Sequence, residues 1–183
     1  MGSSGRKPRI IECYADYNPP PGIATIVEGL LGHVPNELYI GLGEIQLTDS
    51  STLSRAGSRR ATSERVPIGQ TKALYWPPSL GASARIDIYL DKVLNRVPSP
   101  LRRLNLLKEI TIAEVLFHEL GHHFQTQTKY RLRKSKQEVF AHQCSAMLLR
   151  RFIDKKYKFL KPVFAVLNKG LDIRDSISGF RKS

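Results

Sequence analysis

The spacing of apolar residues in the first third of the chain predicts a strand followed by a helix. The segment Arg9–Ala15 has the short, β-branched character of a strand. After a proline-rich break, apolar residues recur at helical spacing over Gly22–Gly32. Pro21 suits the first helical position, because its φ angle is already fixed near the helical value. We therefore expect one short strand and then one amphipathic helix.

Three further segments have the pattern of strands. Leu38–Thr48 alternates well enough for a strand or hairpin, with Gly41 and Gly43 as candidate bulge positions. Thr71–Trp76 has a strand pattern that stops at two prolines, and Ala84–Leu90 alternates cleanly. We expect these last two segments to be neighbouring antiparallel strands of a small twisted sheet, either mixed or antiparallel.

The pattern after Ser99 is helical. Ser99–Pro100 forms a good N-cap and first-turn pair. The spacing of Thr111 and Glu114 is that of a capping box, which predicts a long helix with a break near Ile110. Two further helices are expected after it, over Lys134–Phe152 and Tyr157–Leu167.

The organisation of the chain is that of one α+β domain. Residues 49–69 hold seven Ser or Thr and four Arg with few apolar residues, so we expect a protruding, mobile loop there. The first five residues have the composition of a cloning scar. The remainder, residues 6–183, is expected to form a single domain, with a helix and strands in 6–98, the site-bearing helices in 99–167 and a tail in 168–183.

Composition fits a globular protein of the cytoplasm. The 183 residues are 41% hydrophobic and 25% charged, which excludes a wholly disordered chain. No stretch approaches the ~20 apolar residues that a membrane span needs, and no export signal is visible, so we expect no membrane partner. The two cysteines, Cys13 and Cys144, are too few for a disulfide framework. We expect both to be reduced thiols in the cytoplasm, with Cys144 in the core.

Positive charge is concentrated in the last part of the chain. The formal net charge is +13, from 29 Lys and Arg against 16 Asp and Glu. Residues 1–128 carry 14 basic and 12 acidic side chains, whereas residues 129–183 carry 15 basic and 4 acidic ones. Such a surface attracts polyanions, so the basic segment 129–161 is a candidate nucleic-acid interface. The alternative is a solvated helical face that keeps the protein soluble.

The pentapeptide His118-Glu-Leu-Gly-His122 carries the clearest chemical signal in the sequence. Residues four apart lie on one face of a helix, so both imidazoles can reach a single ion. Glu119 lies beside them and can take a proton from water bound to that ion. This pattern predicts two Zn²⁺ ligands and a general base for peptide hydrolysis. The alternative is a pair of buried histidines without a metal.

A third protein ligand must come from elsewhere in the chain. Gln125 and Thr128 stand where a metzincin needs Gly and His, so that class is excluded. The next helix carries Glu138 and His142, four residues apart. We favour Glu138 as the third ligand. His142 is either the alternative ligand or a residue that supports one, and the commonest role for such a histidine is neutral packing between helices.

The chain from about residue 70 to 150 resembles the small gluzincin-type metallopeptidases, ImmA/IrrE-type enzymes and other minimal zincin domains. The resemblance rests on Val115–His122, on the helix with Glu138-x-x-Ala141 and on Ala146–Leu149. It implies a zincin-like fold, with His118, His122 and Glu138 as zinc ligands and Glu119 as the catalytic base. It also implies a protein or peptide substrate that pairs, as an added strand, with Ala84–Leu90.

Two other functions remain open at this point. Delivery to nucleic acid by residues 129–161 would suggest SprT-like proteases, particularly with His142 as ligand, but Gln143 stands where their signature has Gly. A catalytically silent, metal-free binding module is the other alternative.

The sequence also suggests positions or roles for several other residues. His123 is expected beside the ligands or at the surface. Gly121 is costly inside a helix, which suggests close approach of a strand or of substrate. Trp76 is expected in the core or as a wall of the cleft. The donors that could stabilise the oxyanion are Tyr130, Tyr157 and His142, among which the sequence does not choose.

Overall fold

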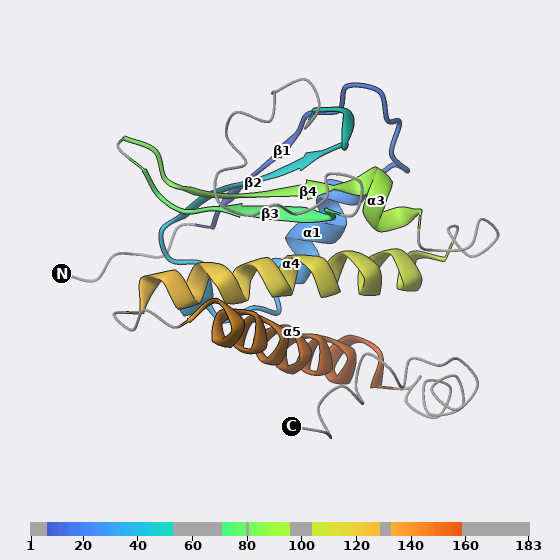
Figure 1. The fold of residues 1–183 in the computed structure, drawn as a ribbon. Coiled ribbons are helices and arrows are strands. Elements are labelled where there is room, and N and C mark those ends of the chain that lie inside the picture. Colours follow the sequence, from blue (N-terminus) through green and yellow to red (C-terminus); the bar gives the residue numbers. More distant parts are fainter. Residues whose placement is uncertain (1–6, 53–70, 80, 96–103, 129–132, 159–183) are drawn as a thin grey trace. The chain divides into compact units, whose positions relative to one another are not determined.

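The structure is a computed structural model, and it describes residues 7–52, 71–79, 81–95, 104–128 and 133–158. The chain divides into two compact units, residues 1–149 and residues 150–183. The elements, in order along the chain, are β1 (Arg9–Glu12), α1 (Ile23–Leu31), the 3-10 helix η1 (Asn36–Leu38), β2 (Leu42–Thr48), β3 (Ala73–Trp76), β4 (Ala84–Tyr89), α3 (Leu90–Leu94), α4 (Asn105–Gln127) and α5 (Lys134–Lys156). Four strands come within the first half of the chain, interrupted by α1 and η1, and helices α3, α4 and α5 follow them (Figure 1).

The four strands form one mixed sheet in the order β1-β2-β4-β3. The first three strands of that order are parallel, and β3 pairs antiparallel with β4. This confirms the expected α+β class, the mixed sheet and the antiparallel pairing of β3 with β4. It also corrects one expectation, because β4 is paired on both sides and cannot accept an added strand. Among the described strands, β3 is the edge that lies beside it.

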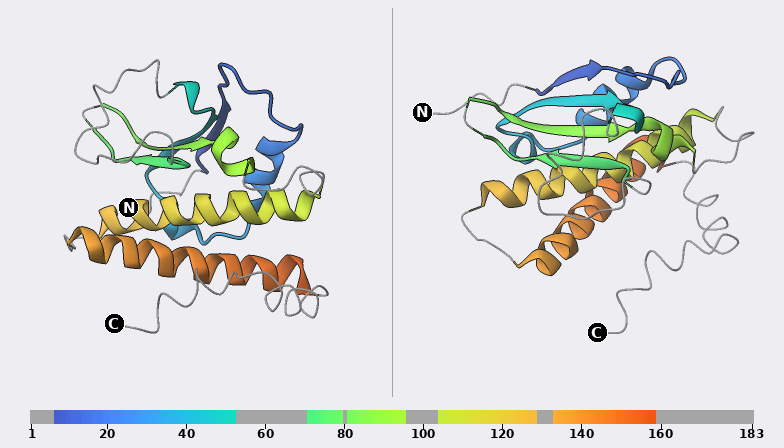
Figure 2. Two further views of the ribbon diagram at one scale, coloured as in Figure 1. Left: turned by 45° about the vertical axis from the view of Figure 1, so that its right-hand side comes forward. Right: turned by 45° about the horizontal axis from the view of Figure 1, so that its top comes forward.

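The hydrophobic core lies between one face of the sheet and the helices α1 and α4 (Figure 2). Alternate residues of β2 and β4 are fully buried there, which is the pattern of a sheet covered on one face. The strand residues concerned are Ile45, Leu47, Ile86 and Ile88. From α4, a broad apolar surface meets them, made by Ile112, Leu116, Phe117 and Leu120. Fully burying each such side chain stabilises the fold by about 1.5–3 kcal/mol.

The opposite face of the sheet is polar. Arg85 Nε lies 2.8 Å from Asp87 Oδ1, and Arg9 Nη2 lies 3.3 Å from Glu44 Oε2. Trp76 donates from its indole Nε1 to Asp87 Oδ2 at 2.7 Å. The tryptophan therefore stands on the polar face, on the other side of the strand from α4, and takes no part in the candidate site.

Two expected element boundaries are wrong, and one helix was not predicted. Helix α4 runs without a break through Ile110, and the Thr111 hydroxyl donates to the Leu107 carbonyl at 2.7 Å, as that of an interior threonine does and that of an N-cap does not. Helix α1 begins at Ile23, and Gly22, with φ of 82°, precedes it in place of Pro21. The short helix α3 continues directly from β4 and was not expected.

Of the two glycines expected at bulge positions in β2, Gly43 lies at a bulge and Gly41 does not. The register of β2 against β4 shifts between Leu42 and Glu44, so the bulge lies at Gly43. A Cβ atom at Gly43 would lie 2.5 Å from the Ser83 Cβ, which explains why only glycine fits there. Gly41 precedes the strand and has φ of 80°.

Several sequence expectations fall wholly or partly outside the described residues. They are most of the loop at 49–69, the Ser99–Pro100 cap, and residues 159–183, which include most of the expected helix Tyr157–Leu167 and the tail. Tyr157 itself follows the end of α5, and its ring packs against Phe152 with centroids 5.7 Å apart. No helix within the described ranges is both long and apolar enough to cross a bilayer. Cys13 is exposed and Cys144 buried, and neither forms a disulfide.

Asp49 organises the end of the sheet at which β1 and β2 finish. The residue is 2% exposed, which contradicts its expected place in a protruding loop. Its Oδ2 accepts hydrogen bonds from the backbone N–H groups of Ala15, Asp16 and Tyr17 at 2.5, 3.0 and 3.3 Å. Burial alone would raise the pKa of this carboxyl, but hydrogen bonds from Ser51 and from the backbone outweigh burial and lower the pKa to about 2.

We expect Asp49→Asn to destabilise the protein at pH 7 by about 1.5–3 kcal/mol, because an amide cannot accept as strongly and turns a donor toward N–H groups. The lowered pKa makes this contribution complete above the unfolded value of 3.8, and it is lost as the pH falls toward about 2. Urea unfolding of both proteins at pH 7 and pH 3 measures it. The exposed Glu37→Gln is the matched control, and an equal effect of both substitutions would contradict the role of Asp49.

Candidate metal centre

Helix α4 presents two imidazoles side by side. His118 and His122 are one helical turn apart, and their Nε2 atoms lie 3.1 Å from each other. Both side chains are about one-fifth exposed, at 21% and 18%. The helix face that carries them is therefore open to solvent, while the neighbouring faces of α4 are buried. The two rings share a point that a single ion can occupy.

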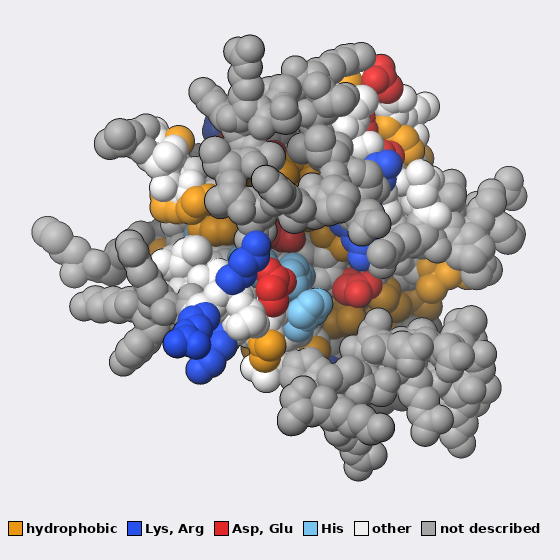
Figure 3. Space-filling model, viewed as in Figure 1, with side chains coloured by type: hydrophobic (Ala, Val, Ile, Leu, Met, Phe, Trp, Pro, Cys, Tyr) orange, Lys and Arg blue, Asp and Glu red, His pale blue; other side chains and the backbone are white. Residues whose placement is uncertain are grey.

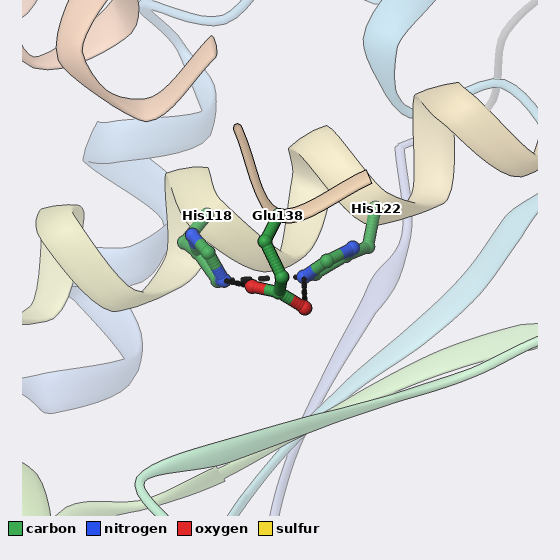
Figure 4. A group of neighbouring side chains, drawn as sticks. All are labelled: His118, His122 and Glu138. Carbon is green, nitrogen blue, oxygen red and sulfur yellow. Dashed lines mark hydrogen bonds and ion pairs between the residues drawn. The ribbon is translucent and has the colours of Figure 1, made fainter. Parts of the chain in front are cut away.

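A carboxylate from α5 completes the group. Glu138 Oε2 lies 3.5 Å from His118 Nε2, and Glu138 Oε1 lies 3.5 Å from His122 Nε2. Figure 4 shows the carboxylate between the two rings. One ligand atom from each residue can be chosen so that all three lie within 4.8 Å of one another. The sequence-predicted set His118, His122 and Glu138 is thus brought together from two helices.

These separations fit a metal ion. In a tetrahedral zinc site with bonds of about 2.0–2.1 Å, neighbouring ligand atoms are about 3.3 Å apart. The nitrogen–nitrogen distance of 3.1 Å and the nitrogen–oxygen distances of 3.5 Å bracket that value. The group could therefore hold a divalent ion with little movement of the side chains.

The electrostatic surroundings keep His118 ready to ligate. Burial lowers its pKa to about 4, and the positive charges of His122, His142 and Lys72 act in the same direction. At neutral pH the ring is therefore uncharged and has a lone pair available for a metal.

His142 lies against His118 but outside the group of three. The centroids of these two rings are 4.6 Å apart at a tilt of 53°. His142 is exposed on α5, and the residues whose ligand atoms converge are His118, His122 and Glu138. The geometry therefore favours Glu138 as the third ligand and places His142 as a neighbour of one ligand.

Glu119 is buried directly beside the first histidine in the sequence. The residue is 8% exposed, in contrast to the two imidazoles, which stand on the open face of α4. The pKa of Tyr89, at the end of β4, is raised mainly by burial and then by the negative charge of Asp87, while Arg85 acts to lower it. The negative charge of Glu119 also contributes to raising this pKa. The carboxylate is therefore close enough to the sheet for its charge to act on β4.

The glycine of the motif allows α4 and α5 to approach closely. A Cβ atom at Gly121 would lie 2.8 Å from the Ala141 Cα and 3.2 Å from the Cys144 Cβ. Ser145 Oγ also donates to the Glu114 carbonyl at 3.0 Å, which fixes the antiparallel register of the two helices. The close approach that the sequence suggested is therefore made by the backbone of α5, not by a strand or substrate. Cys144 lies in this contact, as expected for a core residue.

His123 has a structural role that the sequence did not indicate. It is 1% exposed, so the expectation of a surface position is wrong. Its Nε2 lies 3.0 Å from the Ile40 carbonyl, and its Nδ1 lies 3.2 Å from the Tyr75 hydroxyl. It therefore ties α4 to β3 and to the segment before β2. A second histidine directly after the motif was the only signal for it.

The site is accessible on one face of the protein. Figure 3 shows imidazole side chains at the surface there, with acidic side chains beside them. Of the other donors suggested for an oxyanion, Tyr130 lies outside the described residues and Tyr157 belongs to the second unit.

Comparisons with known proteins add no family to this picture. The sequence matches no protein-family model, and a comparison with curated proteins finds no match.

We expect Gly121→Ala to weaken Zn²⁺ binding by about 10–100-fold, because the added methyl group pushes α5 and Glu138 away from the histidines. The free energy of unfolding should also fall by about 1–3 kcal/mol. Isothermal titration calorimetry after chelation measures the affinity. Gly29→Ala in α1 is the matched control, since its added Cβ meets no atom within 4 Å. Unchanged zinc affinity in Gly121→Ala would show that this helix contact does not set the position of Glu138.

Proposed function

We propose that the protein is a zinc-dependent metallopeptidase with a zincin-like fold. The observation that carries the proposal is the convergence of His118, His122 and Glu138 with a buried glutamate next to the first histidine. Imidazole and carboxylate ligands suit zinc. Three protein ligands leave a fourth position for water or substrate, as catalytic sites do and structural zinc sites do not.

The chemistry divides between the ion and Glu119. A divalent ion held by the three ligands would lower the pKa of a water molecule to near 7 and polarise a peptide carbonyl. Glu119 accepts the proton as the water oxygen forms a bond to the carbonyl carbon. It then donates that proton to the amide nitrogen as the carbon–nitrogen bond breaks. Each cleavage therefore consumes one water molecule, whose oxygen joins the new carboxyl group and whose proton joins the new amino group.

The substrate is expected to pair with β3, one of the two edge strands of the described sheet and the one next to β4. This strand lies beside α4, since the Tyr75 hydroxyl is 2.8 Å from Thr126 Oγ1. A peptide added to this edge would run past the helix face that carries the histidines. The proposal thus moves the substrate strand from β4, where the resemblance put it, to β3.

We expect Glu119→Gln to lower the turnover of quenched fluorescent casein by about 10²–10⁴-fold or more, because the amide cannot accept the proton. Zinc content, measured by atomic emission, should stay the same. Glu114→Gln is the matched control, because that residue is exposed on the same helix one turn before His118. Retained hydrolysis in Glu119→Gln would reject Glu119 as the base. A zinc-free protein that cleaves nothing would instead favour a binding module.

A second candidate function is association with nucleic acid. The described basic residues at the start of α5, Arg133, Lys134 and Lys136, are all exposed. They stand within two turns of Glu138 on the same chain segment. They would hold the peptidase on a DNA- or RNA-bound substrate by contacts to phosphates.

This candidate predicts binding to a labelled 20-base-pair DNA duplex that weakens steeply with salt. The slope of log K against log salt should become shallower by about 0.9 for each phosphate that a substituted lysine no longer neutralises. Fluorescence anisotropy of the double variant Lys134→Gln, Lys136→Gln tests this, with the exposed Lys7→Gln as control. Binding that is absent or insensitive to salt would remove the candidate.

A further inference from the structure

A hollow of about 780 Å³ opens at the C-terminal end of α4, and one of its lining residues, His123, directly follows the candidate ligand His122. It lies between the hairpin that joins β3 to β4, the segment before β2 and the last turn of α4. Its walls include Tyr75, Pro77, Pro78, Ala82, Thr126 and Gln127. The prolines and Ala82 are exposed, so the hollow is open to an incoming ligand.

Along α4, the hollow lies a short distance from the candidate metal ligands. Thr126 is one turn beyond His122, which is about 6 Å along the helix axis. An extended peptide advances about 3.3 Å per residue. The distance of about 6 Å therefore corresponds to about two residues of an extended peptide. If one peptide residue lies opposite His122, the side chain about two residues along the same peptide reaches the hollow. Tyr75 belongs to β3 itself, so the strand edge is continuous with the wall of the hollow.

Three residues of the wall, Tyr75, His123 and Thr126, already have their polar groups paired with one another. The Tyr75 hydroxyl contacts Thr126 Oγ1 at 2.8 Å and His123 Nδ1 at 3.2 Å. Thr126 Oγ1 also donates to the His123 carbonyl at 2.7 Å. These groups do not need a polar ligand to satisfy them, so an apolar side chain can cover them while every one of these hydrogen bonds stays in place.

The hollow also offers nothing to neutralise a charged side chain. None of the described residues that line it is Asp, Glu, Lys or Arg. Both ring nitrogens of His123 are engaged by protein groups, with Nε2 at 3.0 Å from the Ile40 carbonyl and Nδ1 at 3.2 Å from the Tyr75 hydroxyl. A charged side chain that entered would lose hydration without gaining an ion pair.

We propose that this hollow is a specificity subsite for a large uncharged side chain, apolar or aromatic, of a peptide substrate paired with β3. The subsite binds the side chain about two residues from the cleaved bond. This assignment rests on the proposed peptidase function and names a substrate class for the same site.

The test fills the hollow and leaves the metal ligands untouched. Ala82→Trp places an indole in the hollow from an exposed position on the hairpin, where backbone hydrogen bonds between Ser79 and Ala82 at 2.9 and 3.2 Å remain. Ala15→Trp is the matched control, because Ala15 is exposed next to β1 at the opposite edge of the sheet. Both zinc-loaded variants and the wild type are given a proteome-derived peptide mixture, and mass spectrometry reads the cleavage sites.

The wild type and Ala15→Trp should prefer Phe, Tyr, Leu or Met over Asp, Glu, Lys or Arg by at least tenfold at the position two residues from the cut. Ala82→Trp should lose that preference, because the indole occupies the hollow. Ser79→Trp, which fills the hollow from another wall residue, should behave in the same way. If Ala82→Trp shows no cooperative thermal unfolding transition, and so is not folded, the cleavage preference of Ser79→Trp is used in its place to test the subsite.

The outcomes that overturn the two proposals are separate. If the wild type cleaves none of the peptides, the peptidase proposal and this assignment are both overturned. If the wild type cleaves but shows no such preference, or if both filling variants keep it, only the assignment of the hollow is overturned. The Glu119→Gln protein gives a second reading, since it should bind a labelled peptide with Phe at this position at least tenfold more tightly than one with Asp.

Discussion

The contact between Gly121 and Ala141 is the constraint on which the candidate site depends. Two helices with ordinary side chains pack at 8–10 Å, but a glycine facing an alanine lets the backbones come closer. The approach here is so close that a methyl group on Gly121 would lie 2.8 Å from the Ala141 Cα. Glu138 stands less than one turn before Ala141, so this contact brings its short carboxylate side chain between two imidazoles. The same glycine that weakens the helix locally therefore gives the site its third ligand.

A second set of contacts holds α4 to the sheet. His123 is fully buried and bonded to Tyr75 and to the Ile40 carbonyl, so the helix cannot rotate without breaking both. Because His122 and His123 are adjacent, fixing one fixes the direction of the other. The face of α4 that carries His118 and His122 is thereby held at a constant position relative to β3. Buried polar contacts of this kind specify one arrangement where apolar packing alone allows several.

The sequence predicted what depends on local periodicity and missed what depends on tertiary contact. Helical spacing and strand alternation located β1, α1, β3, β4 and both long helices, and the four-residue spacing of His118 and His122 put them on one face. The capping box at Thr111 misled, because a threonine hydroxyl bonds equally well inside a helix. The order of the strands, and therefore which strands lie at the edges of the sheet, could not be read from the residues of any one strand. The contacts of Gly121 with Ala141, of His123 with Tyr75 and Ile40, and of Asp49 with residues 15–17 join segments distant in sequence, so no local pattern could reveal them.

The separation of the three ligands along the chain has a consequence for folding. His122 and Glu138 belong to different helices, so an ion shared by them would join α4 to α5 as a covalent cross-link joins two segments. Binding to the folded chain alone shifts the unfolding equilibrium, by about 4 kcal/mol when the free ion is present at a thousand times its dissociation constant. Loading and helix docking would then be one cooperative event, and a cell's supply of the ion would set how long the assembled form persists.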